Sequence, residues 1–89
     1  MSGSVTVHYW AAAKAAAGTS CDELAVEHPV TLAEVRRRVL ELHPDERLAD
    51  VLAVCSVLVD DQPVATRDPG ATLVPWGSRV EFLPPFAGG

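Results

Sequence analysis

The sequence predicts an α+β fold in which one main helix crosses a mixed sheet of about five strands. Three observations predict it. Two stretches that alternate between apolar and polar residues, 5–10 and 21–27, come first; one capped amphipathic segment follows; and further β-type stretches come after it. With 89 residues, the chain is long enough for one domain with a modest core. We expect that domain over residues 1–83 and an extended tail over residues 84–89.

The N-terminal part is expected to form a β-hairpin. Residues 5–10 alternate in β-favouring residue types and predict a strand. The alanine-rich segment 11–17 before Gly18 predicts a short helical turn that ends on a left-handed glycine. Residues 21–27 alternate again and predict the second strand. The expected apolar face of the first strand is Val5, Val7 and Tyr9.

The next segment carries the strongest local signal for a helix. Thr31 and Glu34 fit a capping box, so the main helix is expected to begin at Thr31 and to end at His43-Pro44. A second, shorter helix is expected over residues 45–53. The main helix is expected to bury an apolar stripe formed by Leu32, Val35, Val39 and Leu42.

The rest of the chain is predicted to return to β-structure. Residues 54–59 read as a strand, residues 60–63 as a turn that leads back to 64–65, and residues 67–78 as a loop with turns. Residues 79–83 alternate and predict the last strand. The side chains expected to face the core from this strand are Val80 and Phe82.

If the first and last strands pair in parallel at the sheet centre, Trp10 and Leu83 lie at the same end, on the face away from the helix. Phe86 would then be close by, and the three would form an apolar docking surface beside the tail. The alternative is that Trp10 tucks under the 11–17 turn.

Composition and charge disfavour several classes of partner. A net charge of −5 with only seven Lys and Arg residues argues against nucleic acid and against an anionic membrane. The one basic cluster, 36–38, is interpreted as a solvated helix face, with an acidic partner as the alternative. No apolar run reaches the ~18 residues of a membrane span and no secretory signal is evident, so we expect a cytoplasmic protein.

Motifs that would support catalysis by the chain alone are missing. The sequence contains no nucleophile elbow, phosphate-binding loop or metalloprotease helix. Cys21 and Cys55 do not form a C-x-x-C pattern, and the histidines lack ligand spacing, so no metal site and no bound cofactor are expected.

The tail offers the one group suited to chemistry. Pro84 and Pro85 predict a stiff lead into the slim pair Gly88-Gly89. The carboxylate of Gly89 is a poor electrophile until a partner enzyme with ATP converts it to an acyl adenylate. It could then accept sulfur, giving a thiocarboxylate, or an amine, giving an isopeptide.

Nearly the whole chain resembles the ubiquitin-like sulfur carriers of the ThiS and MoaD type. The resemblance lies in Tyr9-Trp10-Ala11, Gly18, Thr31-Leu32, Gly77, residues 80–85 and the terminal Gly88-Gly89. It implies the β-grasp fold, in agreement with the predicted order of elements. It also implies adenylation of Gly89 by a MoeB-like enzyme, formation of a thiocarboxylate, and sulfur donation to precursor Z inside a MoaE-like large subunit of molybdopterin synthase.

The resemblance and the shape of the tail give a set of site residues. Gly89, with Gly88, is expected to carry the reaction. The residues expected to bind the partner are Trp10, Leu83, Pro84, Pro85, Phe86 and Ala87. The Pro84-Pro85 pair is more similar to the MoaD branch than to the ThiS branch.

Two departures from the family pattern leave the partner open. Ser78-Arg79 stands where the family often has an Asp-Glu pair, and Asp60-Asp61 follows Val59 where the family has a Val-Asn-Gly hairpin. Other interpretations are a sulfur carrier for cysteine, thiamine or another metabolite, a ubiquitin-like protein modifier, and a binding module with a passive tail.

Overall fold

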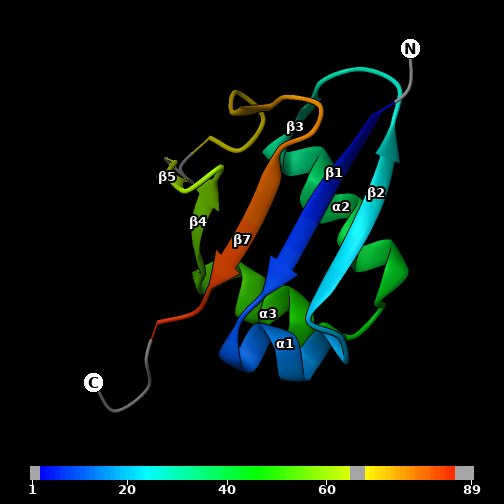
Figure 1. Ribbon diagram of the computed structural model, residues 1–89. Helices are drawn as coiled ribbons and strands as arrows, with labels where there is room; N and C mark the ends of the chain where they lie inside the picture. Colours follow the sequence, from blue (N-terminus) through cyan, green and yellow to red (C-terminus); the bar gives the residue numbers. More distant parts are fainter. Residues whose placement is uncertain (1–2, 65–67, 86–89) are drawn as a thin grey trace.

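A mixed sheet forms the centre of the protein in the computed structural model, which describes residues 3–64 and 68–85. Its strands are β1 (Gly3–Tyr9), β2 (Cys21–Val26), β4 (Ser56–Val59), β5 (Gln62–Pro63) and β7 (Arg79–Leu83). They lie in the order β2-β1-β7-β4-β5 (Figure 1). β1 and β7 are parallel, and the other neighbours are antiparallel. The predicted pairing of the first and last strands at the sheet centre is therefore confirmed.

In the described residues, three helices accompany the sheet: α1 (Ala11–Ala17), α2 (Leu32–Leu42) and α3 (Glu46–Val54). Figure 1 shows α2 and α3 on one face of the sheet, with α1 at the end where β1 and β7 finish. α2 is the longest, with 11 residues, and is the predicted main helix. α1 confirms the predicted helical turn, and α3 confirms the expected shorter helix. No helix in the described part of the chain is long and apolar enough to span a membrane.

Local sequence fixes the ends of these helices. Gly18 ends α1 with φ at 77°, a left-handed conformation in which a side chain would be strained. Thr31 caps α2, and its Oγ1 accepts a hydrogen bond from Glu34 N–H at 3.2 Å. Asp45 caps α3 by accepting Arg47 N–H at 2.8 Å. Each cap satisfies a backbone group that the first or last turn would leave unpaired.

The core lies between the sheet and the helices. The β1 side chains predicted to face it are at most 2% exposed, and Val80 and Phe82 of β7 are 0% exposed. On α2, Leu32, Val35 and Val39 are also 0% exposed. Alternation in the strands and helical spacing in α2 thus identified the buried faces.

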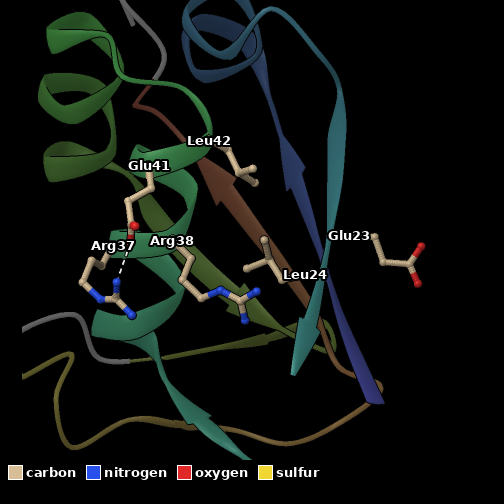
Figure 2. Close-up of a pocket in the computed structure, with 6 residues that line it drawn as sticks. All are labelled: Glu23, Leu24, Arg37, Arg38, Glu41 and Leu42. Carbon is tan, nitrogen blue, oxygen red and sulfur yellow. Dashed lines mark hydrogen bonds and ion pairs between the residues drawn. The ribbon is translucent and has the colours of Figure 1, made fainter. Parts of the chain in front are cut away.

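Leu42 is the exception in the α2 stripe. The prediction that it is buried is wrong, because 53% of its surface is exposed. It lies in the last turn of α2, at an open groove between this helix and the edge strand β2 (Figure 2). Among residues 3–64 and 68–85, no further layer covers it there.

The boundary after α3 also differs from the prediction. Val54 is the last residue of α3 and is exposed, and the following strand begins at Ser56. Between them, Cys55 N–H donates to Leu52 O at 3.3 Å. Val54 is β-branched and favours strands, although here it ends a helix. Local preference therefore could not show whether this residue ends α3 or begins the next strand.

A two-stranded ladder joins the predicted start of the main helix to a segment that was predicted as a loop. β3 (Val30–Thr31) pairs in antiparallel fashion with β6 (Leu73–Val74). Each strand has two residues, too few to show a period in the sequence. The predicted turn over 60–63 is shorter in the structure, because β5 already begins at Gln62. Of the predicted return segment, Val64 N–H donates to Val57 O at 3.1 Å, whereas residue 65 lies outside the described residues.

Candidate functional site

The last strand and the first strand bring the predicted docking residues together. β7 runs parallel to β1, and Tyr9 is the partner of Phe82 in the register. One residue further along each strand come Trp10 and Leu83, and Trp10 N–H donates to Phe82 O at 3.2 Å. We call Trp10, Leu83, Pro84 and Pro85 the tail base, because the chain leaves the sheet here.

Trp10 and Leu83 offer apolar surface at the tail base. Trp10 is 49% exposed, so the alternative in which it tucks under α1 is wrong. Leu83 is half-buried. Both continue the side-chain alternation that points away from the helices, on the face opposite to buried Tyr9 and Phe82. The predicted placement of these two residues at one end and on one face is therefore confirmed.

Buried aromatic and polar contacts support the tail base from below. The rings of Tyr9 and Phe82 stack with centroids 6.3 Å apart. Tyr9 Oη donates a hydrogen bond to Asp22 Oδ2 at 2.8 Å, and the same oxygen lies 2.5 Å from His43 Nε2. Asp22 belongs to β2 and His43 follows α2. Sequence patterns do not reveal this cluster, because its members are far apart along the chain and form no motif.

Burial controls the protonation of the two shielded acids near this region. Burial raises the pKa of Tyr9 far above its ordinary value, and the hydrogen bond and the charge of Asp22 raise it further. The phenol is therefore a neutral donor over the physiological range. Burial also raises the pKa of the Cys55 thiol to about 11, and Cys55 Sγ donates to Val51 O at 3.2 Å. Cys55 is thus a structural thiol, whereas Cys21 is exposed.

The two prolines after the last strand differ in burial. Pro84 is buried against the body of the protein, and Pro85 is exposed. A proline fixed in the body restricts the direction in which the chain continues. The other predicted tail residues, Phe86, Ala87, Gly88 and Gly89, lie outside the described residues, so their roles stay predictions.

A charged group lies on the open face of the sheet beside the tail base. Glu81 of β7 lies between His8 of β1 and Leu58 of β4 in the register, and it is only 9% exposed. Arg79 Nε lies 3.9 Å from Glu81 Oε1. Arg79 Nη2 also donates a hydrogen bond to Asp61 Oδ1 at 2.7 Å, and this bond, together with the negative charges of Asp61 and Glu81, raises the pKa of Arg79.

The two departures from the family pattern meet in this charged group. Asp60 and Asp61 form the turn between β4 and β5, with φ values of 49° and 67°. Positive φ at both central residues is what a two-residue hairpin turn of type I′ requires. Asp60 Oδ1 accepts Arg79 N–H at 2.9 Å, and Asp61 pairs with the Arg79 side chain. The acidic turn therefore complements the arginine that stands in place of the usual acidic pair.

The described residues provide no obvious metal site. No group of three or more His, Cys, Asp and Glu side chains in residues 3–64 and 68–85 lies close enough together to hold a metal ion. The groove in Figure 2 lies away from the tail base, between β2 and α2.

Comparison with protein families agrees with the sequence resemblance. The model of the ThiS family matches residues 7–89. This match runs from the first strand through the terminal Gly88-Gly89. Among curated proteins, none matches the chain significantly.

Several solved structures share the fold. SAMP1 from Haloferax volcanii has a TM-score of 0.80 at 21% identity, over 98% of this chain and 100% of that one. A putative molybdopterin converting factor subunit 1 from Pyrococcus furiosus has a TM-score of 0.75 at 17% identity, over 94% of this chain and 99% of that one. A complex of subunits 1 and 2 of the molybdopterin-converting factor from Helicobacter pylori has a TM-score of 0.66 at 23% identity, over 97% of this chain and 99% of that one. These likenesses confirm the β-grasp, ubiquitin-like fold.

Proposed function

This chain belongs to the ThiS family, and from that premise we propose that it is a sulfur carrier whose Gly89 carboxylate becomes a thiocarboxylate. The observation that carries the proposal is the family match over residues 7–89, which includes the terminal glycine pair. We further propose that the sulfur is used in molybdopterin synthesis, with this chain as the small subunit of the synthase.

The proposed chemistry takes place in two steps at the carboxyl group of Gly89, the first at the α-phosphorus of ATP and the second at the acyl carbon. A carboxylate oxygen of Gly89 attacks the α-phosphorus of ATP in a MoeB-like partner, and pyrophosphate leaves. A sulfur donor at the oxidation level of sulfide then attacks the acyl carbon, and AMP leaves with the bonding electrons. Adenylation is required because a free carboxylate has no good leaving group. The ATP belongs to the partner enzyme, and the chain itself supplies the acyl group.

The tail base supports this proposal through its fixed position. β7 has a hydrogen-bonded neighbour on each side, and Phe82 is fully buried beneath it. Pro84 is buried and Pro85 is exposed, so the departure point of the tail is set by the body. A fixed departure point reduces the conformational entropy lost when the tail enters a partner's active site. Trp10 and Leu83 would contact the partner beside it.

A large subunit is the proposed partner for sulfur donation. The Helicobacter pylori structure is a complex of subunits 1 and 2 of the molybdopterin-converting factor, and its first subunit shares the fold of this chain. Trp10 is suited to such an interface, because a large aromatic side chain that is half-exposed in the free protein can be buried in a complex. We propose a MoaE-like protein in this role and a cytoplasmic location for the pair.

A protein modifier is the second candidate function. SAMP1, which has the same fold, is called a small archaeal modifier protein, and a Urm1 structure from Trypanosoma brucei also matches, with a TM-score of 0.69 at 19% identity. In that case the activated Gly89 would react with an amine. Sulfur carriers for cysteine, thiamine or another metabolite share the first step and differ only in the acceptor.

Intact-mass spectrometry tests the first step. The chain is incubated with a MoeB-like activating enzyme, ATP and a sulfur donor, and we expect a mass increase that corresponds to replacing one oxygen atom by sulfur. A chain without Gly89 should show no increase, whereas Arg47→Gln, which changes an exposed residue on α3, should react like the original. An unchanged mass with several activating enzymes would contradict the proposal.

The acceptor is identified in a second experiment. The thiocarboxylated chain is mixed with a MoaE-like large subunit and precursor Z, and we expect sulfur to appear in the pterin product. A ladder of larger conjugates in cell extract, without pterin product, would favour the modifier. Trp10→Ala should weaken the complex with the large subunit while the first step proceeds normally.

A further inference from the structure

The edge strand β2 presents unpaired backbone groups to solvent. Tyr9 N–H donates to Ser20 O at 2.9 Å, and bonded pairs recur at every second residue of an antiparallel ladder. The register therefore leaves the backbone groups of Cys21, Glu23 and Ala25 pointing away from β1. Within the described part of the chain, no hydrogen bond reaches Glu23 or Ala25 on that side. Such an edge can accept another strand.

A groove follows this edge between β2 and α2. Its lining is Glu23, Leu24, Arg37, Arg38, Glu41 and Leu42. A second hollow, past Ala25 and Val26, is also lined by Arg37 and Arg38, so the groove continues along the strand. Figure 2 shows Leu24, Leu42 and Arg38 directed into the space between helix and strand, and Glu23 directed away from it. We call this feature the β2 groove.

Arg38 is the unpaired cation of the β2 groove. The neighbouring Arg37 has two carboxylate partners on the same helix, Glu34 at 3.7 Å and Glu41. For Arg38, by contrast, the described residues supply neither an ion pair nor a hydrogen bond, although its side chain is half-buried. A guanidinium in such a place can bind a carboxylate from a ligand through two hydrogen bonds.

The contacts at one end keep the β2 groove open at a fixed width. Asp22 of β2 and His43, which follows α2, are joined at 2.5 Å, and Tyr9 adds a second bond to Asp22. Leu42, which precedes His43, stays exposed instead of closing over the groove. A preformed groove lowers the cost of ordering it when a ligand binds.

A second copy of this chain fits the edge poorly. The antiparallel pairing that would align all outward-facing groups of two β2 strands places Glu23 opposite Glu23. Like charges directly opposite each other destabilise a strand pair. The edge therefore disfavours self-association and favours a strand of different sequence.

We propose that the β2 groove binds an extended segment of a partner protein, which adds a strand to β2 and places an acidic side chain on Arg38. Alternation then defines the chemistry of this segment. Side chains on one face are aliphatic and acidic, and contact Leu24, Leu42 and Arg38. Those on the other face are neutral or basic, because Glu23 lies there. The segment differs from the partners of the tail, since β1 lies between β2 and β7.

The test is an NMR titration of the full chain, labelled with ¹⁵N, using the synthetic peptide acetyl-Thr-Val-Lys-Ile-Thr-Asp-amide. We expect chemical-shift changes at the amides of Cys21, Glu23 and Ala25 and slower hydrogen exchange at the last two. Arg38→Gln should weaken binding about tenfold, because it removes a charge-assisted contact. The matched control Arg47→Gln, on α3, should bind normally. Folding of each variant is checked in the same spectra.

Two further peptides make the result decisive. A peptide with lysine in place of aspartate should bind about tenfold more weakly. A peptide with N-methylated alternate amides, which cannot form the ladder, should not bind. The proposal is overturned if the parent peptide causes no chemical-shift changes up to about 1 mM, or if Arg38→Gln binds the peptide equally well. It is also overturned if sedimentation shows that the free chain is a dimer and the amides of Glu23 and Ala25 are already protected from hydrogen exchange in it.

The result is independent of the proposed sulfur chemistry. A chain without Gly89 should bind the peptide as well as the complete sequence does. Failure of the β2 groove therefore leaves the mass measurement on Gly89 unaffected, and failure of thiocarboxylate formation leaves the titration unaffected.

Discussion

Strand β7 and strand β2 bury similar side chains but differ in their backbone pairing. Val80 and Phe82 of β7 are 0% exposed, and Leu24 and Val26 of β2 are 3% and 4% exposed. β7, however, lies between β1 and β4, whereas β2 pairs on one side only. Side-chain burial therefore anchors both strands, while their position in the sheet decides whether one or both sides of the backbone are paired. The central strand fixes the point where the tail begins, and the edge strand has its outer backbone groups unpaired within the described part of the chain.

The largest effect is expected from removing the aromatic anchor of the central strand. Phe82→Ala should lower the free energy of unfolding by about 3 to 5 kcal/mol, because it leaves a cavity beside Tyr9. Urea unfolding followed by tryptophan fluorescence measures it. Leu83→Ala, at the next and half-buried position, serves as control and should cost about 1 kcal/mol. Equal losses for the two variants would contradict the role of buried Phe82 as the main anchor of β7.

Alkaline pH should weaken the contacts beneath both strands. The pKa of Cys55 rises from 9.0 to about 11 on folding, and that of Tyr9 rises from 10.0 to a still higher value. Since both pKa values are raised, their stabilising contributions are complete below pH 9.0 and are lost as the pH rises through the folded values. The loss from Cys55 alone is about 1 to 3 kcal/mol.

The pH dependence is checked by measuring the unfolding free energy from about pH 8 to about pH 11, a range that includes the ordinary pKa values of Cys and Tyr. Cys55→Ala and Tyr9→Phe should each flatten it, and the remaining slope belongs to groups outside the core. A profile that is already flat in the unmodified chain would contradict the burial of these two acids.

The contact that ties the edge strand to α2 should have an intermediate effect. Asp22→Asn keeps the shape of the side chain but removes the carboxylate that Tyr9 and His43 share. We expect a loss of about 1.5 to 2 kcal/mol in unfolding free energy, since hydrogen bonds to a charged group are among the stronger ones. The adjacent Glu23→Gln is the matched control and should change stability by less than about 0.5 kcal/mol. A larger loss for Glu23 would mean that the edge is not free.

The smallest effect is expected at the opposite margin of the sheet. Asp61→Asn keeps a residue that tolerates positive φ but removes the charge that pairs with Arg79. Both partners are largely exposed, so unfolding free energy should fall by less than about 1 kcal/mol. Raising the salt concentration should reduce the difference between Asp61→Asn and the original. A loss as large as that of Asp22→Asn would remove the contrast between the two margins.

The sequence by itself determined the main helix, the strands that face the core and the order of elements. Alternation in β1 and β7, and the capping residues Thr31 and Gly18, act through local backbone preferences and side-chain periodicity, which a single chain displays directly. It also determined the family, because Gly88-Gly89 and residues 80–85 are contiguous motifs. The same local information placed Trp10 and Leu83 at one end of the sheet, once the first and last strands were assumed to pair in parallel.

Only the tertiary structure decided the features that depend on distant segments. The bond network of Tyr9, Asp22 and His43, and the pairing of Asp61 with Arg79, join residues far apart in the sequence, and neither set forms a motif. The two-residue strands β3 and β6 depend on each other, because neither has enough residues to form a period. Leu42 shared the spacing of its buried neighbours, and the open groove beside the edge strand left it exposed. Periodicity shows which face of a helix is apolar, but the extent of the opposing layer decides how much of that face is covered.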